Sequence, residues 1–387
     1  MSDTWPPSVP ARPPRRRRWP TAVGAVVALL LVLVLVASRI QLNEYVLTPG
    51  QAQPVGPLVK VPAERSHRIV GTILLTDVYL TRVTLLSYLP DRLNGDAQLV
   101  SATALLGPYT PPAELTAQGY LEMAQAQAAA KAAALTRLGY AVGAHDAGTL
   151  VFSVEPGSPA VPALKVGQIV TSIDGTPTPD DCAFIRALGP YRAGQTVRLA
   201  VERSTVTPDA VQRPGPTVVE RVRLARRPAG AGSATSTGCP GGPVVSHGYL
   251  GVVVETQQDF DYPFRVSVST ATIGGPSAGL AMTLAIVDKL YGGHLTGGRT
   301  VAATGTIAPT GQVGPVGGVA QKTVAVERAG ATVFLVPPAE YATAMSKDVP
   351  SLHIYRVSTL ADALSVLRRL GGRVPPEPAA VTAEKPR

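Results

Sequence analysis

The feature that most constrains this chain is an uncharged, apolar segment near its N-terminus. Residues 21–37 carry no charged side chain, consist mainly of Val, Leu and Ala, and follow four consecutive arginines, Arg15–Arg18. At about 1.5 Å per residue, a helix over residues 19–38 would be about 30 Å long, which matches the hydrocarbon thickness of a bilayer. The segment predicts one transmembrane helix, a signal anchor, after a basic N-terminus of residues 1–18.

The charges that flank this helix predict its orientation. A run of arginines precedes it and only Arg39 follows it directly, and positive charge favours the cytoplasmic side. We therefore expect a single-pass protein of the cell membrane with a cytoplasmic N-terminus and an extracytoplasmic body. A cleaved signal peptide is the alternative, because Ala37-Ser38 offers small residues for cleavage, but the apolar run exceeds the usual core of about 7–15 residues. In both interpretations the rest of the chain lies outside the cytoplasm.

Composition excludes several other classes of protein. Lys and Arg total 35 and Asp and Glu total 26, but six of the basic residues lie within the first forty positions, so the body is nearly balanced. With 5% aromatic residues it lacks the basic surface of a nucleic-acid-binding protein. Two cysteines and five isolated histidines form no zinc motif, so we expect no metal and no cofactor. Cys182 and Cys239 could pair in an oxidising compartment, and the sequence leaves this open.

The first part of the body combines irregular and regular patterns. The prolines and glycines of residues 43–62 argue against a helix or a central strand and predict an extended stalk. Residues 68–106 are rich in Val, Ile, Leu, Thr and Tyr and contain the turn pair Asn94-Gly95, which favours strands. An Ala- and Gln-rich stretch over residues 112–138 predicts one long helix. Residues 39–139 are therefore expected to form a stalk, strands and a long helix.

The rest of the chain divides by composition. Residues 140–228 alternate short apolar runs with turns, which predicts a small antiparallel domain. Small and polar residues make 229–243 a flexible linker. Residues 244–370 alternate strand and helix patterns, and residues 371–387 are expected to be a disordered tail.

A serine stands at a strand-to-helix turn in this last domain. The strand pattern of residues 264–269 leads into Gly275-Pro276-Ser277-Ala278, and an apolar helix follows to about Leu290. Glycine permits unusual dihedral angles and proline favours the first helical position, so Ser277 is expected on the first turn of the helix. Backbone N–H groups and the positive end of the helix dipole can stabilise an oxyanion there. The alternative is that Ser277 only caps the helix.

A nucleophilic serine needs a base, and a lysine is the best candidate. None of the five histidines carries a triad signature. Of seven lysines, Lys289 would lie about 18 Å from Ser277 along the same helix, too far to reach it. Lys322 follows the glycine-rich residues 311–318 and precedes a helix at 323–329, in surroundings with few charges that would lower its pKa. The alternative is an ordinary exposed lysine.

Four motifs in this region together resemble the proteolytic domain of the Lon family. They are Gly275-Pro276-Ser277-Ala278-Gly279, Thr304-Gly305-Thr306-Ile307, Gly311-Gln312-Val313 and Gly317-Gly318-Val319-Ala320-Gln321-Lys322. The resemblance implies a catalytic dyad of Ser277 and Lys322, with Thr304 supporting the lysine. It also places Gly275, Pro276 and Ala278 in the active-site loop near the oxyanion hole.

The preceding domain resembles a bacterial PDZ module. The resemblance rests on residues 154–160 and 163–175, with Gln168 where PDZ modules usually have Asp. The carboxylate-binding loop is expected near Leu138-Gly139-Tyr140. Behind one anchor, the two units resemble the PDZ–Lon membrane proteases. The implied fold is an α/β (α+β) Lon-type proteolytic domain plus a small, mainly-β PDZ domain behind one N-terminal transmembrane helix.

The expected function follows from this resemblance. The sequence contains no Gly-Lys dipeptide, so the phosphate-binding motif of an ATPase is absent. We expect a membrane-anchored, ATP-independent serine endopeptidase that cleaves extracytoplasmic proteins or peptides, with the PDZ domain recognising substrates or chain ends. The alternatives are a non-catalytic PDZ scaffold with a Lon-like fold and an enzyme limited to self-cleavage. No nucleic-acid partner is expected, and assembly into a homo-oligomer stays open.

Overall fold

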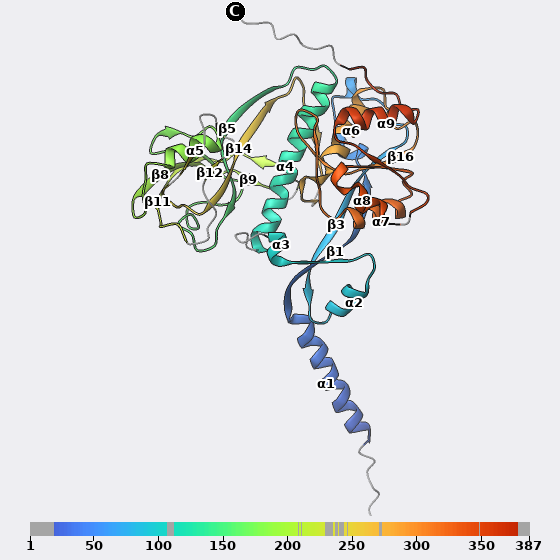
Figure 1. Cartoon of the computed structure of the whole chain (residues 1–387), viewed down its shortest axis with the longest axis horizontal. Coiled ribbons are helices and arrows are strands. Elements are labelled where there is room, and N and C mark those ends of the chain that lie inside the picture. The colour runs from blue at the N-terminus through green and yellow to red at the C-terminus, as the bar shows by residue number, and fades with distance from the viewer. Residues whose placement is uncertain are drawn as a thin grey trace, which may run out of the picture.

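The larger domain is built on one six-stranded sheet with helices on both faces (Figure 1). The computed structural model describes residues 19–106, 112–207, 209, 211–228, 235–236, 239, 244–245, 247–270, 273–347 and 349–377. In sheet order, the strands are β20 (His353–Arg356), β19 (Val333–Val336), β16 (Thr300–Ala303), β3 (Thr72–Thr84), β1 (Gln41–Pro54) and β4 (Gln98–Ser101). Strands β20, β19, β16 and β3 are parallel, whereas β1 is antiparallel to both of its neighbours.

Alternating side chains of the central strands divide the core into two layers. Ile73 and Leu75 of β3 face one cluster, and Leu74 between them faces the other, as the pleat of a strand requires. The first layer holds α4 (Pro112–Arg137), α6 (Gly279–Leu290) and α9 (Leu360–Arg369), and the second holds α7 (Val319–Arg328) and α8 (Tyr341–Met345). The result is a three-layer arrangement of helix, sheet and helix.

The stalk predicted for residues 43–62 is wrong, because most of it is strand β1. Strand β1 pairs with β3 from Gln41 to Pro54, whereas β4 pairs only with Glu44–Leu47 of β1. From Pro49 onward β1 is therefore an edge strand on that side, where a missing N–H is tolerated. The register slips between Pro49 and Ala52, and the N–H of Gln51 donates to the Asp77 carboxylate (2.6 Å).

Residues 68–106 are only partly strand. β3 is one long strand, and the Asn94-Gly95 turn forms as predicted, with the Asn94 carbonyl accepting from Ala97 N (3.0 Å). β4 is a second strand in this region, and two helices lie before and after it, α2 (Tyr88–Leu93) and α3 (Ala102–Leu106). The long helix α4 is confirmed, and Gly139 after it has φ +84°, the left-handed conformation that commonly ends helices.

The small domain is a second sheet, with strand order β11-β8-β6-β5-β14. Its elements are β5 (Gly143–Val154), β6 (Ile169–Ile173), β7 (Thr176–Pro177), α5 (Asp181–Leu188), β8 (Thr196–Glu202), β11 (Thr217–Arg223) and β14 (Val252–Asp261). Strand β14 was expected within a proteolytic unit of residues 244–370, but it pairs with β5 along its length. Residues 39–139, expected as a separate unit, supply β1, β3 and α4 to the larger domain. The small domain is therefore inserted into the larger domain, which the chain builds in two parts.

Short strand pairs complete the described structure. They are β2 (Val59–Lys60) with β15 (Ser267–Val268), β9 (Thr205–Val206) with β10 (Gln212–Arg213), β12 (Thr235–Ser236) with β13 (Val244–Val245), and β17 (Thr306–Ile307) with β18 (Val313–Gly314). Most of the predicted linker, residues 229–243, lies outside the described residues.

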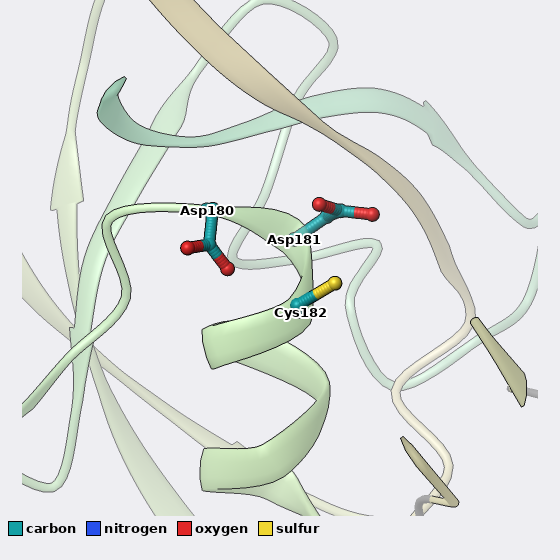
Figure 2. Close-up of side chains that lie close together, drawn as sticks. All are labelled: Asp180, Asp181 and Cys182. Carbon is teal, nitrogen blue, oxygen red and sulfur yellow. The ribbon is translucent and has the colours of Figure 1, made fainter. Parts of the chain in front are cut away.

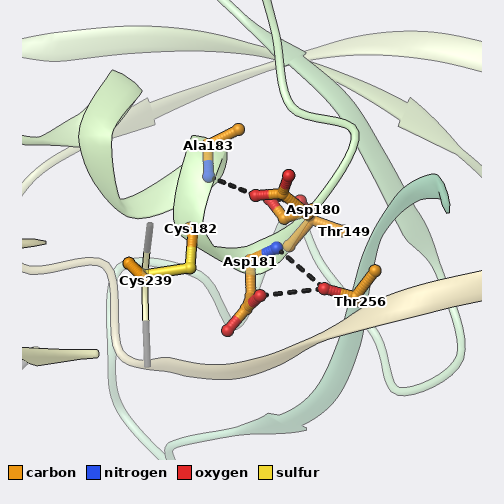
Figure 3. The surroundings of a disulfide bond; sticks show 7 residues. All are labelled: Thr149, Asp180, Asp181, Cys182, Ala183, Cys239 and Thr256. Atoms are coloured by element: carbon orange, nitrogen blue, oxygen red, sulfur yellow. Dashed lines mark hydrogen bonds between the residues drawn. A yellow bond between two sulfur atoms is a disulfide. The ribbon is translucent and has the colours of Figure 1, made fainter. Parts of the chain in front are cut away.

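Cys182 and Cys239 form a disulfide, with their Cα atoms 5.6 Å apart (Figure 3). The bond attaches Cys239 to the first turn of α5. Asp180 caps the same helix, because its carboxylate accepts from the Ala183 N–H (2.6 Å). The pairing that the sequence left open is therefore present.

The predicted disordered tail is wrong for its first seven residues. Arg373 N donates to His294 O (2.9 Å), and Arg137 donates to the Pro375 and Pro376 carbonyls. Val374 packs against the larger core. Residues 378–387 lie outside the described part of the chain.

The N-terminal helix α1 (Trp19–Arg39) projects away from the body (Figure 1). Its described apolar side chains are exposed, for example Leu31 at 64% and Leu35 at 61%. Among the described residues, no helix combines the length and apolar character needed to cross a membrane.

Candidate active site

Ser277 lies in the short 3₁₀ turn η3 (Pro276–Ala278) that opens α6, as the sequence predicts. Gly275 precedes it with φ +87°, a conformation that side chains disfavour. The Ser277 carbonyl accepts from Gly305 N (2.9 Å) and from Thr304 Oγ1 (3.3 Å). These two bonds fix the serine turn against the segment that follows β16.

The serine turn also packs tightly against α4. Gly275 N donates to Gly119 O in the middle of that helix (2.7 Å). A Cβ atom on Gly274 would lie only 3.2 Å from the Gly119 carbonyl carbon, so the turn approaches the helix backbone to a distance that glycine permits. Helix α4 precedes the small domain in the chain and Ser277 follows that domain, so α4 helps to position a serine that is distant in sequence.

Lys322 is almost completely buried, with 2% of its surface exposed. It lies on the first turn of α7, which begins at Val319, slightly before the helix start that the sequence suggests. Its Nζ donates to Thr304 Oγ1 (3.2 Å). Burial lowers the pKa of Lys322 to about 8, against the opposing effect of Asp77 and Glu340. The predicted desolvation of this lysine is thus present.

Thr304 connects the lysine to the serine turn. Its side chain is fully buried, accepts from Lys322 and donates to the Ser277 carbonyl. The structure therefore brings Ser277, Thr304 and Lys322 together through one hydrogen-bonded chain. Within the described residues, the Ser277 hydroxyl itself makes no hydrogen bond to Lys322.

The other predicted residues of the loop have distinct roles. The amide of Gly275 is already bonded to Gly119 O, and Pro276 has no N–H, so neither is free to donate to an oxyanion. Ala278 is buried in the larger core. Gly275 and Pro276 therefore shape the loop without offering it a free N–H group.

Two carboxylates near the lysine were not found from the sequence. Asp77 lies on β3, where burial raises its pKa and the Gln51 N–H and the charge of Lys322 lower it. Glu340 lies in η4 (Pro338–Glu340) and accepts from Val316 N (3.4 Å), while its Oε2 is buried without a hydrogen-bond partner among the described residues. Neither residue lies in a motif, and only the fold brings them near Lys322.

A pocket of about 270 Å³ borders the serine turn at Pro276. Its walls come from α4, from β5 and β14 of the small domain, and from Thr306 and Ile307 in β17. A second groove of about 690 Å³ runs between α4 and β14 and shares Gln125 and Ala129 with the first. Together they extend from the small domain to the serine turn.

One group of metal-capable side chains occurs among the described residues, at Asp180, Asp181 and Cys182 (Figure 2). The Cys182 sulfur is bonded to Cys239, and Asp180 caps α5. Asp181 accepts from Thr256 Oγ1 (2.8 Å) and so joins α5 to β14 (Figure 3). These three side chains therefore each have a structural partner, in a helix cap, a hydrogen bond to β14 and a disulfide.

Comparison with protein families identifies both domains. Residues 257–367 match the family described as the Lon protease (S16) C-terminal proteolytic domain. The chain carries a Lon-type proteolytic domain. Residues 136–210 match the PDZ domain family, so a PDZ domain lies upstream, as predicted. The match to the Lon-type domain begins within β14 and does not include β1 and β3, which complete its sheet.

Two solved structures that are similar to part of the chain are PDZ domains. The PDZ domain of the SdrC-like protein from Listeria monocytogenes is 19% identical, with 28% of this chain and 87% of that chain covered and a TM-score of 0.19. The corresponding domain from Listeria innocua is 20% identical, with 28% and 92% covered and a TM-score of 0.18. Comparison with curated proteins finds no match.

Residues 138–140, where the carboxylate-binding loop was expected, do not pack in the core of the PDZ domain. Leu138 and Tyr140 pack against the core of the Lon-type domain, and Gly139 ends α4. These residues therefore pack away from the core of the PDZ domain.

Proposed function

We propose that the chain is a serine endopeptidase in which Ser277 is the nucleophile and Lys322 the general base. The observation that carries this proposal is the buried lysine, whose Nζ donates to Thr304 Oγ1 beside the serine turn. A lysine held in an apolar interior loses its proton more readily than one in water, and only the neutral amine accepts a proton from serine.

The mechanism assigns a step to each residue. The Ser277 hydroxyl attacks the scissile carbonyl while Lys322 takes its proton, and the lysine returns the proton to the leaving amine. Thr304 orients the lysine and holds the serine turn. Backbone N–H groups at or after Ser277 stabilise the oxyanion. The hydrogen bond between the two reacting groups forms when substrate is bound, since catalytic bonds are often long in the free enzyme.

The proposed reaction needs no nucleotide. The sequence lacks the Gly-Lys dipeptide of a phosphate-binding loop, so the chain has no ATPase motif. Substrates would be short peptides or proteins that are already unfolded.

We propose that residues 19–38 anchor the enzyme in a membrane, with the body outside. The proposal rests on the uncharged sequence, the preceding arginines and the exposed apolar side chains of α1. Carbonate extraction of membranes should leave the protein in the pellet. Intact spheroplasts treated with protease should lose the body, and protection of the body until lysis would contradict the orientation.

The PDZ domain would deliver substrate chains or chain ends. Strand β14 ends its sheet, and among the described residues its outer edge pairs with no other strand. An extended peptide can add to such an edge through backbone hydrogen bonds. The groove of about 690 Å³ between β14 and α4 provides the space for it.

A serine-reactive fluorophosphonate probe tests the proposed nucleophile. The wild-type chain should be labelled on Ser277, and Ser277→Ala should lose the label while keeping its thermal unfolding temperature. Thr283→Ala is a matched control, because Thr283 is a buried hydroxyl residue on α6 whose side chain bonds the helix backbone. Equal labelling of wild type and Ser277→Ala would favour a non-catalytic PDZ scaffold, and loss of only a self-cleavage fragment would favour the self-processing alternative.

A further inference from the structure

The pocket beside the serine turn contains two carboxylates. One wall is a single face of α4, because positions 122, 125, 126 and 129 are spaced at three and four residues. This face contributes Glu122, and β14 contributes Glu255. Pro276, which borders the pocket, is adjacent to Ser277 in the chain.

These carboxylates lack a cationic partner within the described residues. Gln125 Nε2 donates to Glu255 Oε2 (3.2 Å), and no Lys, Arg or His lies within ion-pair distance of either glutamate there. The lysine on the same helix, Lys131, lies over the Tyr262 ring (4.8 Å). Burial, and then the charge of Glu255, raise the pKa of Glu122. Two partly buried like charges destabilise each other, and a cation between them would remove that cost.

The remaining lining indicates what kind of cation fits. Ala126, Ala129, Phe152 and Ile307 give the pocket apolar walls, which suit the methylene stem of a long side chain. The volume of about 270 Å³ is too large for a bare metal ion and lies just below the range of about 300–1,000 Å³ typical of small-molecule sites. A single long, basic side chain matches both the walls and the charge.

We propose that this pocket binds a lysine or arginine side chain of the substrate close to the scissile bond. The inference rests on the proposed function, because it assigns the pocket to the substrate that Ser277 attacks. Glu122 and Glu255 then determine specificity and take no part in the chemistry. The enzyme would prefer to cleave at basic positions of an extended chain.

The test uses the full chain and a synthetic peptide library in which all residue types occur around each bond. Mass spectrometry identifies the cleaved bonds. Wild-type enzyme should show Lys and Arg enriched at one fixed position relative to the cut. Glu122→Gln and Glu255→Gln keep the side-chain shape and should each lower this enrichment by about tenfold. Glu122→Lys should shift the preference toward Asp and Glu.

Glu202→Gln is the matched control, because Glu202 is a half-buried acid of the same PDZ sheet, on β8, that does not line the pocket. It should retain the wild-type preference. Binding of a Lys-containing peptide to Ser277→Ala, measured by fluorescence anisotropy with and without Glu122→Gln, gives a readout independent of turnover.

The outcomes separate the two proposals. Ser277-dependent cleavage without basic enrichment, or enrichment unchanged in the Glu122→Gln, Glu255→Gln double variant, would overturn the assignment of the pocket alone. Absence of any Ser277-dependent cleavage would overturn the proposed function and this assignment with it.

Discussion

Helix α6 of the Lon-type domain, which follows Ser277, and helix α5 of the PDZ domain are held in place in different ways. In the Lon-type domain, every residue of α6 from Gly279 to Asp288 is buried, so packing fixes this helix along its length. In the PDZ domain, α5 buries only Phe184 and Leu188 and is held at its start by a cap and a disulfide. A catalytic serine must be placed to within a fraction of an ångström, whereas a recognition domain needs only a stable sheet edge. We therefore expect changes in the Lon-type domain to affect turnover and changes at the PDZ disulfide to affect stability.

The largest effect should come from the serine. Ser277→Ala should lower kcat/KM for peptide hydrolysis by at least about 10³-fold, because the nucleophile is removed and no other group replaces it. The unfolding temperature should change little, since Ser277 bonds the neighbouring segment through its carbonyl, which alanine keeps. Residual activity above one tenth of wild type would contradict the assignment.

A smaller loss is expected for the residue that connects lysine and serine. Thr304→Val keeps the shape of the buried side chain but removes the hydroxyl that accepts from Lys322 and donates to the serine turn. We expect kcat to fall by about 10–100-fold, mostly without a change in KM, because a positioning bond is lost and no reacting group is removed. Thr323→Val is a control on α7, as its hydroxyl bonds only the helix backbone. Equal kcat values for wild type and Thr304→Val would remove Thr304 from the mechanism.

Asp77 should change the pH dependence more than the maximal rate. Its charge favours the protonated lysine, so Asp77→Asn should lower the pKa of Lys322 and move the acidic limb of the kcat/KM profile to lower pH. Asparagine keeps the oxygen that accepts from Gln51, so the bulge of β1 should survive. An acidic limb at the same pH in wild type and Asp77→Asn would show that Asp77 does not affect the pKa of Lys322.

The smallest effect on turnover should come from the PDZ disulfide. Cys182→Ser should lower the free energy of unfolding of the PDZ domain by about 2–4 kcal/mol, yet leave the rate on short peptides within about twofold. Thermal unfolding and peptide hydrolysis measured on the same sample would show the separation. A tenfold loss of peptide hydrolysis would mean that the two domains are coupled more closely than their cores indicate.

The sequence predicts the local parts of this fold better than its long-range assembly. The turn at Ser277, the long helix α4 and the buried Lys322 follow from short patterns of glycine, proline and apolar residues. Strand β1 does not, because its prolines are acceptable only where β4 leaves the edge free, which depends on pairing with distant segments. The place of β14 in the PDZ sheet and the approach of Asp77 to Lys322 likewise depend on contacts between distant parts of the chain.

In the candidate site, too, some residues can be predicted from local sequence patterns and others cannot. Ser277, Thr304 and Lys322 are recognisable because they lie in motifs, and the structure adds the order of their hydrogen bonds. Glu122 and Glu255 lie in a helix and a strand without any motif, and each resembles an ordinary surface acid in the sequence. Only the fold brings them to the same pocket.

The central claim is that Lys322 acts as the base, and hydrolysis by Lys322→Arg tests it most directly. Arginine keeps the positive charge but stays protonated in proteins, so it cannot accept the proton of serine. We predict that Lys322→Arg is as inactive as Ser277→Ala. We also predict that wild-type kcat/KM rises with pH to a plateau above about pH 8, where the lysine is neutral. Substantial turnover by Lys322→Arg, on a peptide whose cleavage requires Ser277, would contradict the account.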